Sequence, residues 1–123
     1  MKIWHWYIDL KTVSEANSSE HWTKKAKRHR LQKMKIKAAL LQERPHIQLP
    51  CAIHLTRIAP RTLDVDDNLP MAFKFIKDAI ADYIIPGQAP GRADDCKSIV
   101  WRFKQEKGQP KQMGVRIEII EGS

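Results

Sequence analysis

The hydrophobic residues of this chain change their spacing along the sequence, and this alternation limits the folds open to it. Residues 2–10, 47–59, 98–107 and 114–122 alternate in the manner of strands. Residues 20–42 and 69–83 repeat at helical spacing instead. The order β-α-β-α-β-β predicts an α/β (α+β) two-layer sandwich, with two helices on a four-stranded mixed sheet. A length of 123 residues suits one domain, spanning 1–123.

The first predicted helix, from about Glu20 to Gln42, has two unlike halves. In its second half, an apolar stripe at 3-4-3 spacing is expected to face the core: Leu31, Met34, Ala38 and Leu41. The first half is basic nearly all round, and its only apolar side chains are Trp22 and Ala26. We expect this end to stand in solvent or against a partner, with Trp22 packed on the sheet rather than stacked on a base.

The second predicted helix carries its apolar residues on one side: Leu69, Ala72, Phe73, Ile76, Ile80 and Tyr83. Pro70 is tolerated in the first turn, where a backbone N–H has no partner within the helix. The two strands that follow, residues 98–107 and 114–122, are joined by a turn around Gly108, Gln109 and Pro110. We expect these two strands to form a hairpin.

Positive charge is in excess, with 22 Lys and Arg against 14 Asp and Glu, a formal net charge of +8. A basic surface attracts polyanions, and nucleic acid is the usual one, although charge also serves solubility. The basic residues surround the first helix instead of forming one stripe, which favours phosphate contacts over a solvated face. The predicted DNA-binding residues of this helix are Lys24, Lys25, Lys27, Arg28, Arg30 and Lys33.

Negative charge gathers in the segment LDVDDNLPMAFKF, residues 63–75. Asp67 or Asn68 is placed to cap the helix that follows, since both residue types accept hydrogen bonds from its free N–H groups. One capping residue is enough, so Asp64 and Asp66 remain unexplained. Clustered carboxylates repel one another unless a cation compensates. The segment therefore predicts a helix cap, together with a cation site or, as the alternative, a solvated acidic loop.

The type of cation site follows from the spacing. A calcium-binding EF-hand loop is excluded, because Leu69 and Phe75 stand where glycine and a bidentate glutamate are required. A catalytic Mg²⁺ site needs only a few carboxylates, with waters and substrate phosphates as the other ligands. A second acidic pair, Asp94 and Asp95, precedes the third strand. If the second and third strands are neighbours, we expect the two acidic segments to converge and to support metal-assisted phosphodiester cleavage.

Other chemistries have less support. Cys51 and Cys96 lack CxxC spacing, which favours two free thiols in a reducing compartment. The five histidines show no zinc-binding spacing, and the five glycines form no phosphate-binding loop. Neither an apolar run long enough to span a membrane nor a signal peptide stands out. We expect a cytoplasmic protein with no membrane association and no small-molecule cofactor.

With these elements and motifs in this order, the chain resembles the RusA-type Holliday junction resolvases, which are small endodeoxyribonucleases found largely in phages and prophages. The likeness spans most of the chain and includes its length, its element order and the loop SEANSSEHW before the basic helix. Two elements are the most specific. One is the aspartate-rich motif DVDDNL at 64–69, which opens a helix. The other is the acidic pair in ADDCKSI at 93–99, before the final basic strands.

The resemblance implies that these aspartates bind Mg²⁺, or Mn²⁺ as an alternative, and are required for cleavage. Asp67 matches the aspartate directly before Asn-Leu, and Asp95 matches the second residue of the later pair. Val65 stands where the family has its other motif aspartate, so Asp66 or Asp64 must take that place. The implied metal ligands are Asp64, Asp66, Asp67 and Asp95.

The resemblance also implies a lysine near the reacting phosphate, but Met71 stands at the family's position. Lys74, one turn further on the same helix face, is expected to reach the phosphate, and Lys77 is the weaker candidate. The implied catalytic set is therefore Asp66, Asp67, Asp95 and Lys74, with Lys77 joining the DNA-binding residues.

The family acts as a homodimer, which presents two matching sites to the opposed strands of a four-way DNA junction. The resemblance therefore implies paired, symmetric cleavage of branched DNA in recombination and repair. Two other hypotheses stand beside it. One is a non-catalytic phage DNA- or RNA-binding regulatory protein with structural aspartates. The other is a subunit of a larger assembly, whose basic helix docks an acidic partner.

Overall fold

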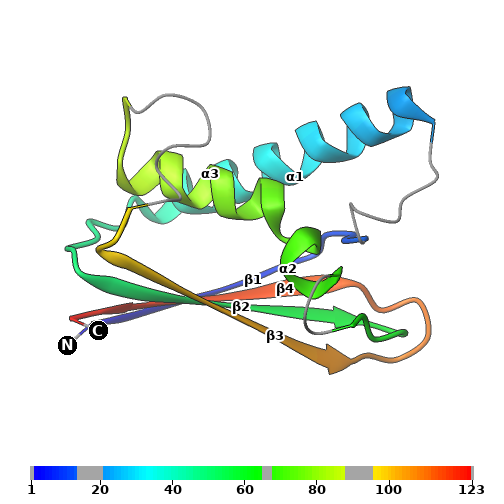
Figure 1. The fold of residues 1–123 in the computed structure, drawn as a ribbon. Coiled ribbons are helices and arrows are strands. Elements are labelled where there is room, and N and C mark those ends of the chain that lie inside the picture. The colour runs from blue at the N-terminus through cyan, green and yellow to red at the C-terminus, as the bar shows by residue number, and fades with distance from the viewer. Residues whose placement is uncertain (1, 14–20, 65–67, 88–95, 123) are drawn as a thin grey trace.

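A computed structural model describes residues 2–13, 21–64, 68–87 and 96–122 of the chain. These residues form seven elements: β1 (Ile3–Ile8), α1 (Trp22–Glu43), β2 (Cys51–Ala59), α2 (Asn68–Ala72), α3 (Lys74–Ile84), β3 (Ile99–Lys107) and β4 (Gly114–Glu121). Figure 1 shows α1 and α3 on the same face of the four-stranded sheet. The predicted two-layer α+β architecture with a mixed sheet is confirmed.

The order of strands in the sheet is β1-β4-β2-β3. β2 pairs with β3 in parallel, from Cys51↔Ile99 to Ala59↔Lys107, and with β4 in antiparallel fashion. The predicted hairpin of β3 and β4 is therefore wrong, because β2 lies between them. Their connection crosses the end of β2, where the N–H of Gly108 donates to the carbonyl of Ala59 at 2.8 Å. The turn signal at 108–110 does mark a reversal of chain direction between β3 and β4. It does not specify which strand each of them pairs with.

The core lies between the sheet and the helices. The alternation predicted for the first strand is confirmed, since Trp6 and Ile8 are buried while Ile3 and Tyr7 are exposed. The inward residues of β4 and β2 are more completely buried: Val115, Ile117, Ile119, Cys51, Ile53 and Leu55. Burying one such aliphatic side chain contributes about 1.5–3 kcal/mol relative to leaving it in water. These central strands therefore form the most stable part of the structure.

The stripe that α1 turns toward the core differs from the predicted one. Leu31, Met34 and Leu41 are all exposed, Met34 by 59%. The buried residues lie instead at a regular spacing of four: Arg28, Gln32, Ile36 and Leu40. Gln32 is held there because its Nε2 donates to the backbone carbonyl of Lys11 at 2.9 Å. A polar side chain with a partner on the sheet layer thus takes a place that the apolar pattern assigned to leucine and methionine.

The second predicted helix is divided in two. Phe73 has φ −99° and ψ 3°, outside the usual helical values, and separates α2 from α3. The predicted apolar face is nevertheless confirmed, since Leu69, Phe73, Ile76 and Ile80 are buried. Phe73 stacks on Phe103 of β3, with ring centroids 5.5 Å apart. The break lets this phenylalanine reach β3 while both short helices keep contact with the core.

The other face of the sheet carries no helix in the described residues (Figure 1). There, Arg116 of β4 forms a bidentate pair with Glu106 of β3, at 2.8 and 3.3 Å. The hydrogen bond with Arg116 lowers the pKa of Glu106. By register, Arg116 lies opposite Thr56 and Glu106 lies opposite Ile58, so the pair spans β2. This helps explain why Thr56 and Ile58 are buried on the uncovered face.

Candidate nucleic-acid interface

Of the four predicted metal ligands, the structure describes only Asp64; Asp66, Asp67 and Asp95 lie outside the described residues. Asp64 is exposed, and its backbone carbonyl accepts a hydrogen bond from the N–H of Leu69 at 2.8 Å. Asn68 is the first residue of α2. The described residues contain no group of three or more metal-binding side chains. The predicted Mg²⁺ site therefore stays a prediction from sequence.

The expected convergence of the two acidic segments rested on the second and third strands being neighbours. They are neighbours, but their parallel pairing places the end of β2 beside the end of β3 rather than its start. Leu63 exchanges two hydrogen bonds with the side chain of Gln105, while Ser98 accepts one from the N–H of Cys51. The described residues next to the two acidic segments are thus fixed near opposite ends of β3, roughly 20 Å apart at the usual rise per strand residue.

Predicted basic residues from both helices do come together, around the ring of Phe75 on α3. His29 of α1 stacks on this ring, with centroids 3.7 Å apart. The ammonium groups of Lys33 and Lys74 each lie 5.5 Å from the ring centroid, on α1 and α3 respectively. At that distance each cation is attracted by the electron-rich face of the ring. The predicted catalytic lysine and a predicted DNA-binding lysine therefore share one aromatic support.

The neighbouring surface continues this basic character. Lys77 lies with its Nζ 5.3 Å from the ring centroid of Trp101 on β3. A hollow of about 300 Å³ is lined by Pro70, Met71, Lys74, Lys77 and Phe103. Lys74 lies beside Met71 at this hollow, in agreement with the expected shared face, although the helix is interrupted between them. Lys77 lines the same hollow. We call Lys33, Lys74 and Lys77 the lysine cluster.

The first half of α1 stands apart from the lysine cluster. Lys24, Lys27 and Arg30 are exposed, and Lys25 is half-buried. Arg28 differs from the expectation that it contacts DNA, since it is 8% exposed and lies on the face that carries Gln32 and Ile36. Figure 1 shows the first turns of α1 extending past the beginning of α3. The prediction that this end stands away from the core is confirmed for its exposed residues, which include Lys24, Lys27 and Arg30.

Trp22, at the start of α1, is 72% exposed. The expectation that it packs on the sheet is therefore wrong. Its ring lies 5.7 Å from that of His21, at a tilt of 33°. His21 is also the N-cap, where its Nδ1 accepts from the N–H of Thr23 at 3.3 Å. The helix thus begins on an aromatic pair that faces solvent.

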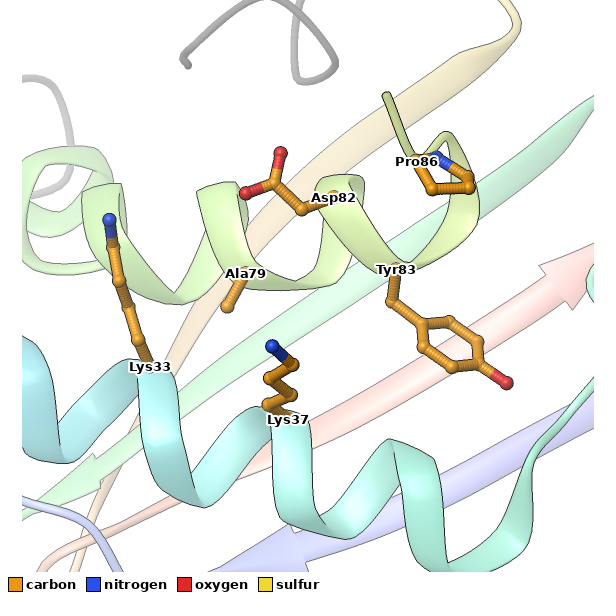
Figure 2. A pocket seen from close by; sticks show the side chains of 6 residues that line it. All are labelled: Lys33, Lys37, Ala79, Asp82, Tyr83 and Pro86. Atoms are coloured by element: carbon orange, nitrogen blue, oxygen red, sulfur yellow. The ribbon is translucent and has the colours of Figure 1, made fainter. Parts of the chain in front are cut away.

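A groove between the two helices extends the basic surface further (Figure 2). Its volume is about 420 Å³, and its lining includes Lys33 and Lys37 of α1 and Asp82 and Tyr83 of α3. Figure 2 shows both lysines reaching from α1 toward α3. Lys37 was not among the contact residues predicted from the sequence. Its position four residues after Lys33, one turn along the same helix face, was the available signal.

Comparisons of the chain with models of known protein families and with curated proteins found no match. Within the part of the chain that the structure describes, no helix has the length and apolar character needed to cross a membrane.

Cys51 and Cys96 are free, as predicted. Cys51 is fully buried in the core, in agreement with a structural role for this residue.

Proposed function

We propose that this protein is a magnesium-dependent endodeoxyribonuclease of the RusA type, which cuts four-way DNA junctions by paired, symmetric strand cleavage. One observation carries the proposal. In the sequence, the aspartate-rich segment 64–68 leads directly into α2 and α3. There, Lys74 shares the ring of Phe75 with Lys33 of α1, and Lys77 lines the same hollow as Lys74. A sequence segment that supplies both carboxylates able to hold a metal and lysines able to hold phosphate offers what phosphodiester cleavage requires.

In this proposal the chain's own residues divide the work. The lysine cluster binds the phosphates on either side of the scissile bond, with Lys74 nearest to the reacting one. The rings of Phe75 and Trp101 attract the three ammonium groups and so help to position them. Asp67, Asp95 and either Asp64 or Asp66 would hold Mg²⁺ or Mn²⁺. Such a metal, when bound, lowers the pKa of water and stabilises charge on the phosphate.

The exposed half of α1 extends the contact to the arms of the junction. Lys24, Lys27 and Arg30 present charges without packing on the core. Phosphate contacts of this kind position DNA without reading its sequence, and they weaken as salt rises. A homodimer would place two copies of this surface around one junction, in keeping with its two-fold symmetry.

The direct test is cleavage of a synthetic four-way junction, compared with a linear duplex and single-stranded DNA, in Mg²⁺ or in EDTA. We expect paired nicks at symmetric positions on the junction only, and only with Mg²⁺. Asp67→Asn and Asp95→Asn should abolish cleavage while the protein still binds the junction. If both variants cut as well as the wild type, the proposed site is wrong.

Lysine variants test the same proposed site through residues that the structure describes. Lys74→Met should reduce cleavage strongly and binding only slightly, since it removes one contact out of several. Lys104→Met is the matched control, because Lys104 is exposed on the uncovered face of the sheet, away from the helices. Equal cleavage by the two variants would remove Lys74 from the catalytic set.

A non-catalytic DNA- or RNA-binding protein is the second candidate. The observation that favours it is the parallel pairing of β2 and β3, which fixes Leu63 and Ser98 near opposite ends of β3. A site using both acidic segments must therefore bridge that length or combine two copies of the chain. Tight junction or RNA binding without any cleavage, in Mg²⁺ and in Mn²⁺, would support this candidate over the nuclease.

A further inference from the structure

Arg57 of β2 is a buried cation without a carboxylate partner among the described residues. It is 6% exposed, near the end of a central strand and on the side of the sheet that the helices cover. Its neighbours on β3 and β4 are Gln105 and Val115, which carry no charge. Buried arginines are ordinarily paired, because removing an ion from water is costly. The surroundings of Arg57 therefore call for an explanation.

The hydrogen bonds of Arg57 go to neutral oxygens. Its Nε–H donates to Thr12 Oγ1 at 3.0 Å, and its Nη1 donates to the backbone carbonyl of Arg61 at 2.6 Å. A guanidinium has five N–H donors, so these two bonds use less than half of its capacity. They also hold the planar group in one orientation, between the segment after β1 and the segment after β2. Within the described part of the chain, the charge is thus positioned but has no carboxylate beside it.

Burial accordingly lowers the pKa of Arg57 below its ordinary value. The group remains a cation at neutral pH, since an arginine pKa lies far above 7. An anion in contact with Arg57 would offset the free-energy cost of removing its charge from water.

The space beside Arg57 is suited to a small anion. A hollow of about 220 Å³ is lined by Arg57, Arg61 and Thr12, with apolar walls from Val13, Pro60 and Met113. None of the described residues that line it is acidic. This volume is below the usual range of pockets for drug-sized ligands. Two guanidinium groups and a hydroxyl around such a hollow match the oxygens of one phosphate group, which arginine binds through parallel N–H donors.

We infer that the hollow at the end of β2 is a phosphate-binding site, with Arg57 as its buried anchor and Arg61 as its exposed second cation. The phosphate group can belong to a nucleic-acid backbone or to free inorganic phosphate, which share the same oxygens. The inference does not depend on the proposed cleavage, because it concerns binding at residues outside the lysine cluster and the aspartate-rich motif.

The test uses the full chain with ¹⁵N-labelled arginine, observed by NMR at the side-chain Nε–Hε groups. Inorganic phosphate is titrated at constant ionic strength, with chloride as the balancing anion. We expect the Arg57 signal to shift and saturate, and the Arg102 signal to stay in place, since Arg102 is exposed on the uncovered face. An Arg57 signal that moves no more than that of Arg102 would overturn the inference.

Variants separate binding from a purely structural role of Arg57. Arg61→Gln keeps the backbone carbonyl that Arg57 uses and should weaken phosphate binding about tenfold, the usual scale for one charged hydrogen bond. Arg57→Lys keeps the charge but loses the parallel N–H donors of the guanidinium group. This variant should therefore bind phosphate more weakly while remaining folded. Arg102→Gln should bind as the wild type does. If Arg61→Gln also binds as the wild type does, the site is refuted.

A second titration with the oligonucleotide d(T)₄ identifies the source of the phosphate. Saturation at a lower concentration than inorganic phosphate, with phosphate as a competitor, points to a nucleic-acid backbone. Saturation by inorganic phosphate alone points to the free anion. Either result supports the site. Failure of both ligands rejects it, whatever the outcome of the cleavage assays.

Discussion

The two helices that cover the sheet are held by different interactions. α3 has 11 residues and buries Ile76, Ile80 and Ala81, so it is anchored by apolar packing. α1 is twice as long at 22 residues, yet its buried face includes Arg28 and Gln32. Apolar burial makes a large, non-directional contribution, whereas a buried polar side chain does little more than repay its own desolvation. The comparison indicates that α3 is held mainly by apolar packing, while α1 combines apolar and polar burial and leaves much of its surface exposed.

The largest expected effect lies at the break before α3. Phe73→Ala should lower the free energy of unfolding by about 3–5 kcal/mol, because a fully buried ring stacked on Phe103 is removed. Urea denaturation followed by tryptophan fluorescence measures this loss. Phe75→Ala is the matched control, since Phe75 is only half-buried and should cost much less. Equal losses would mean that the two rings contribute alike to the core.

The exclusion of water from the core at the beginning of β2 can be tested through Cys51. Burial above all, then Cys96 and Glu121, raises the pKa of Cys51 from 9.0 to about 11. The unfolded chain therefore loses this proton at lower pH than the folded protein does. The contribution to stability is complete below pH 9.0 and is lost as the pH rises toward about 11.

Cys51→Ala removes that contribution. Wild type should lose more stability than this variant between pH 7 and pH 10.5, by on the order of 1–3 kcal/mol. Urea denaturation at the two pH values gives the comparison, and the variant's own cavity cancels because it is present at both. Parallel losses in the two proteins would show that water reaches Cys51 in the folded state.

The exposed basic residues in the first half of α1 should matter for binding and not for stability. Replacing Lys24, Lys27 and Arg30 together by glutamine should lower affinity for a four-way junction about tenfold. It should also reduce the slope of log affinity against log salt by about 2 to 3. Fluorescence anisotropy at several salt concentrations measures both quantities.

The same charge change on β3 is the control for this binding prediction. Arg102, Lys104 and Lys107 are exposed on β3, and glutamine there should leave junction binding nearly unchanged. Equal salt slopes for the two triple variants would mean that DNA responds to net charge alone and not to α1.

The smallest effect is expected from the apolar residues that α1 exposes. Leu31→Gln and Met34→Gln should each change the free energy of unfolding by less than about 0.5 kcal/mol. Ile36→Ala, on the buried stripe of the same helix, should cost about 2–5 kcal/mol. Measured at low protein concentration, a large loss for Leu31→Gln would show that this face is covered within the fold.

The elements that could be predicted from the sequence are those whose hydrophobic pattern fits a single arrangement. The alternation of Trp4, Trp6 and Ile8 has a single strand interpretation, and the stripe from Leu69 to Ile80 has a single helical one. On α1, two stripes compete, and the one with fewer apolar residues is buried. The decision depends on the carbonyl of Lys11, which gives Gln32 a partner and is invisible in a local pattern.

The strand order and the site were harder to predict for related reasons. The turn at Gly108–Pro110 signals a reversal, but whether β4 returns beside β3 or beyond β2 depends on which strand edge is already occupied. For the site, the sequence singled out Lys33, Lys74 and Lys77, and the structure brings them close to aromatic rings of the same surface. Arg57 escaped notice because a lone arginine in an apolar strand carries no signal until its neighbours are known.

The position of β4 between β1 and β2 has a consequence for how the protein is made. Among the described strands, β1 pairs with β4 alone, so β1 must wait until β4, the latest of them in the sequence, has been synthesised. On the ribosome, β2 and β3 can pair in parallel beneath α3 while β1 still lacks its neighbour. Such long-range pairing is slow, and it leaves strand edges exposed in the meantime. A chain released before Gly114 would therefore be a target for chaperones and proteases rather than a smaller folded domain.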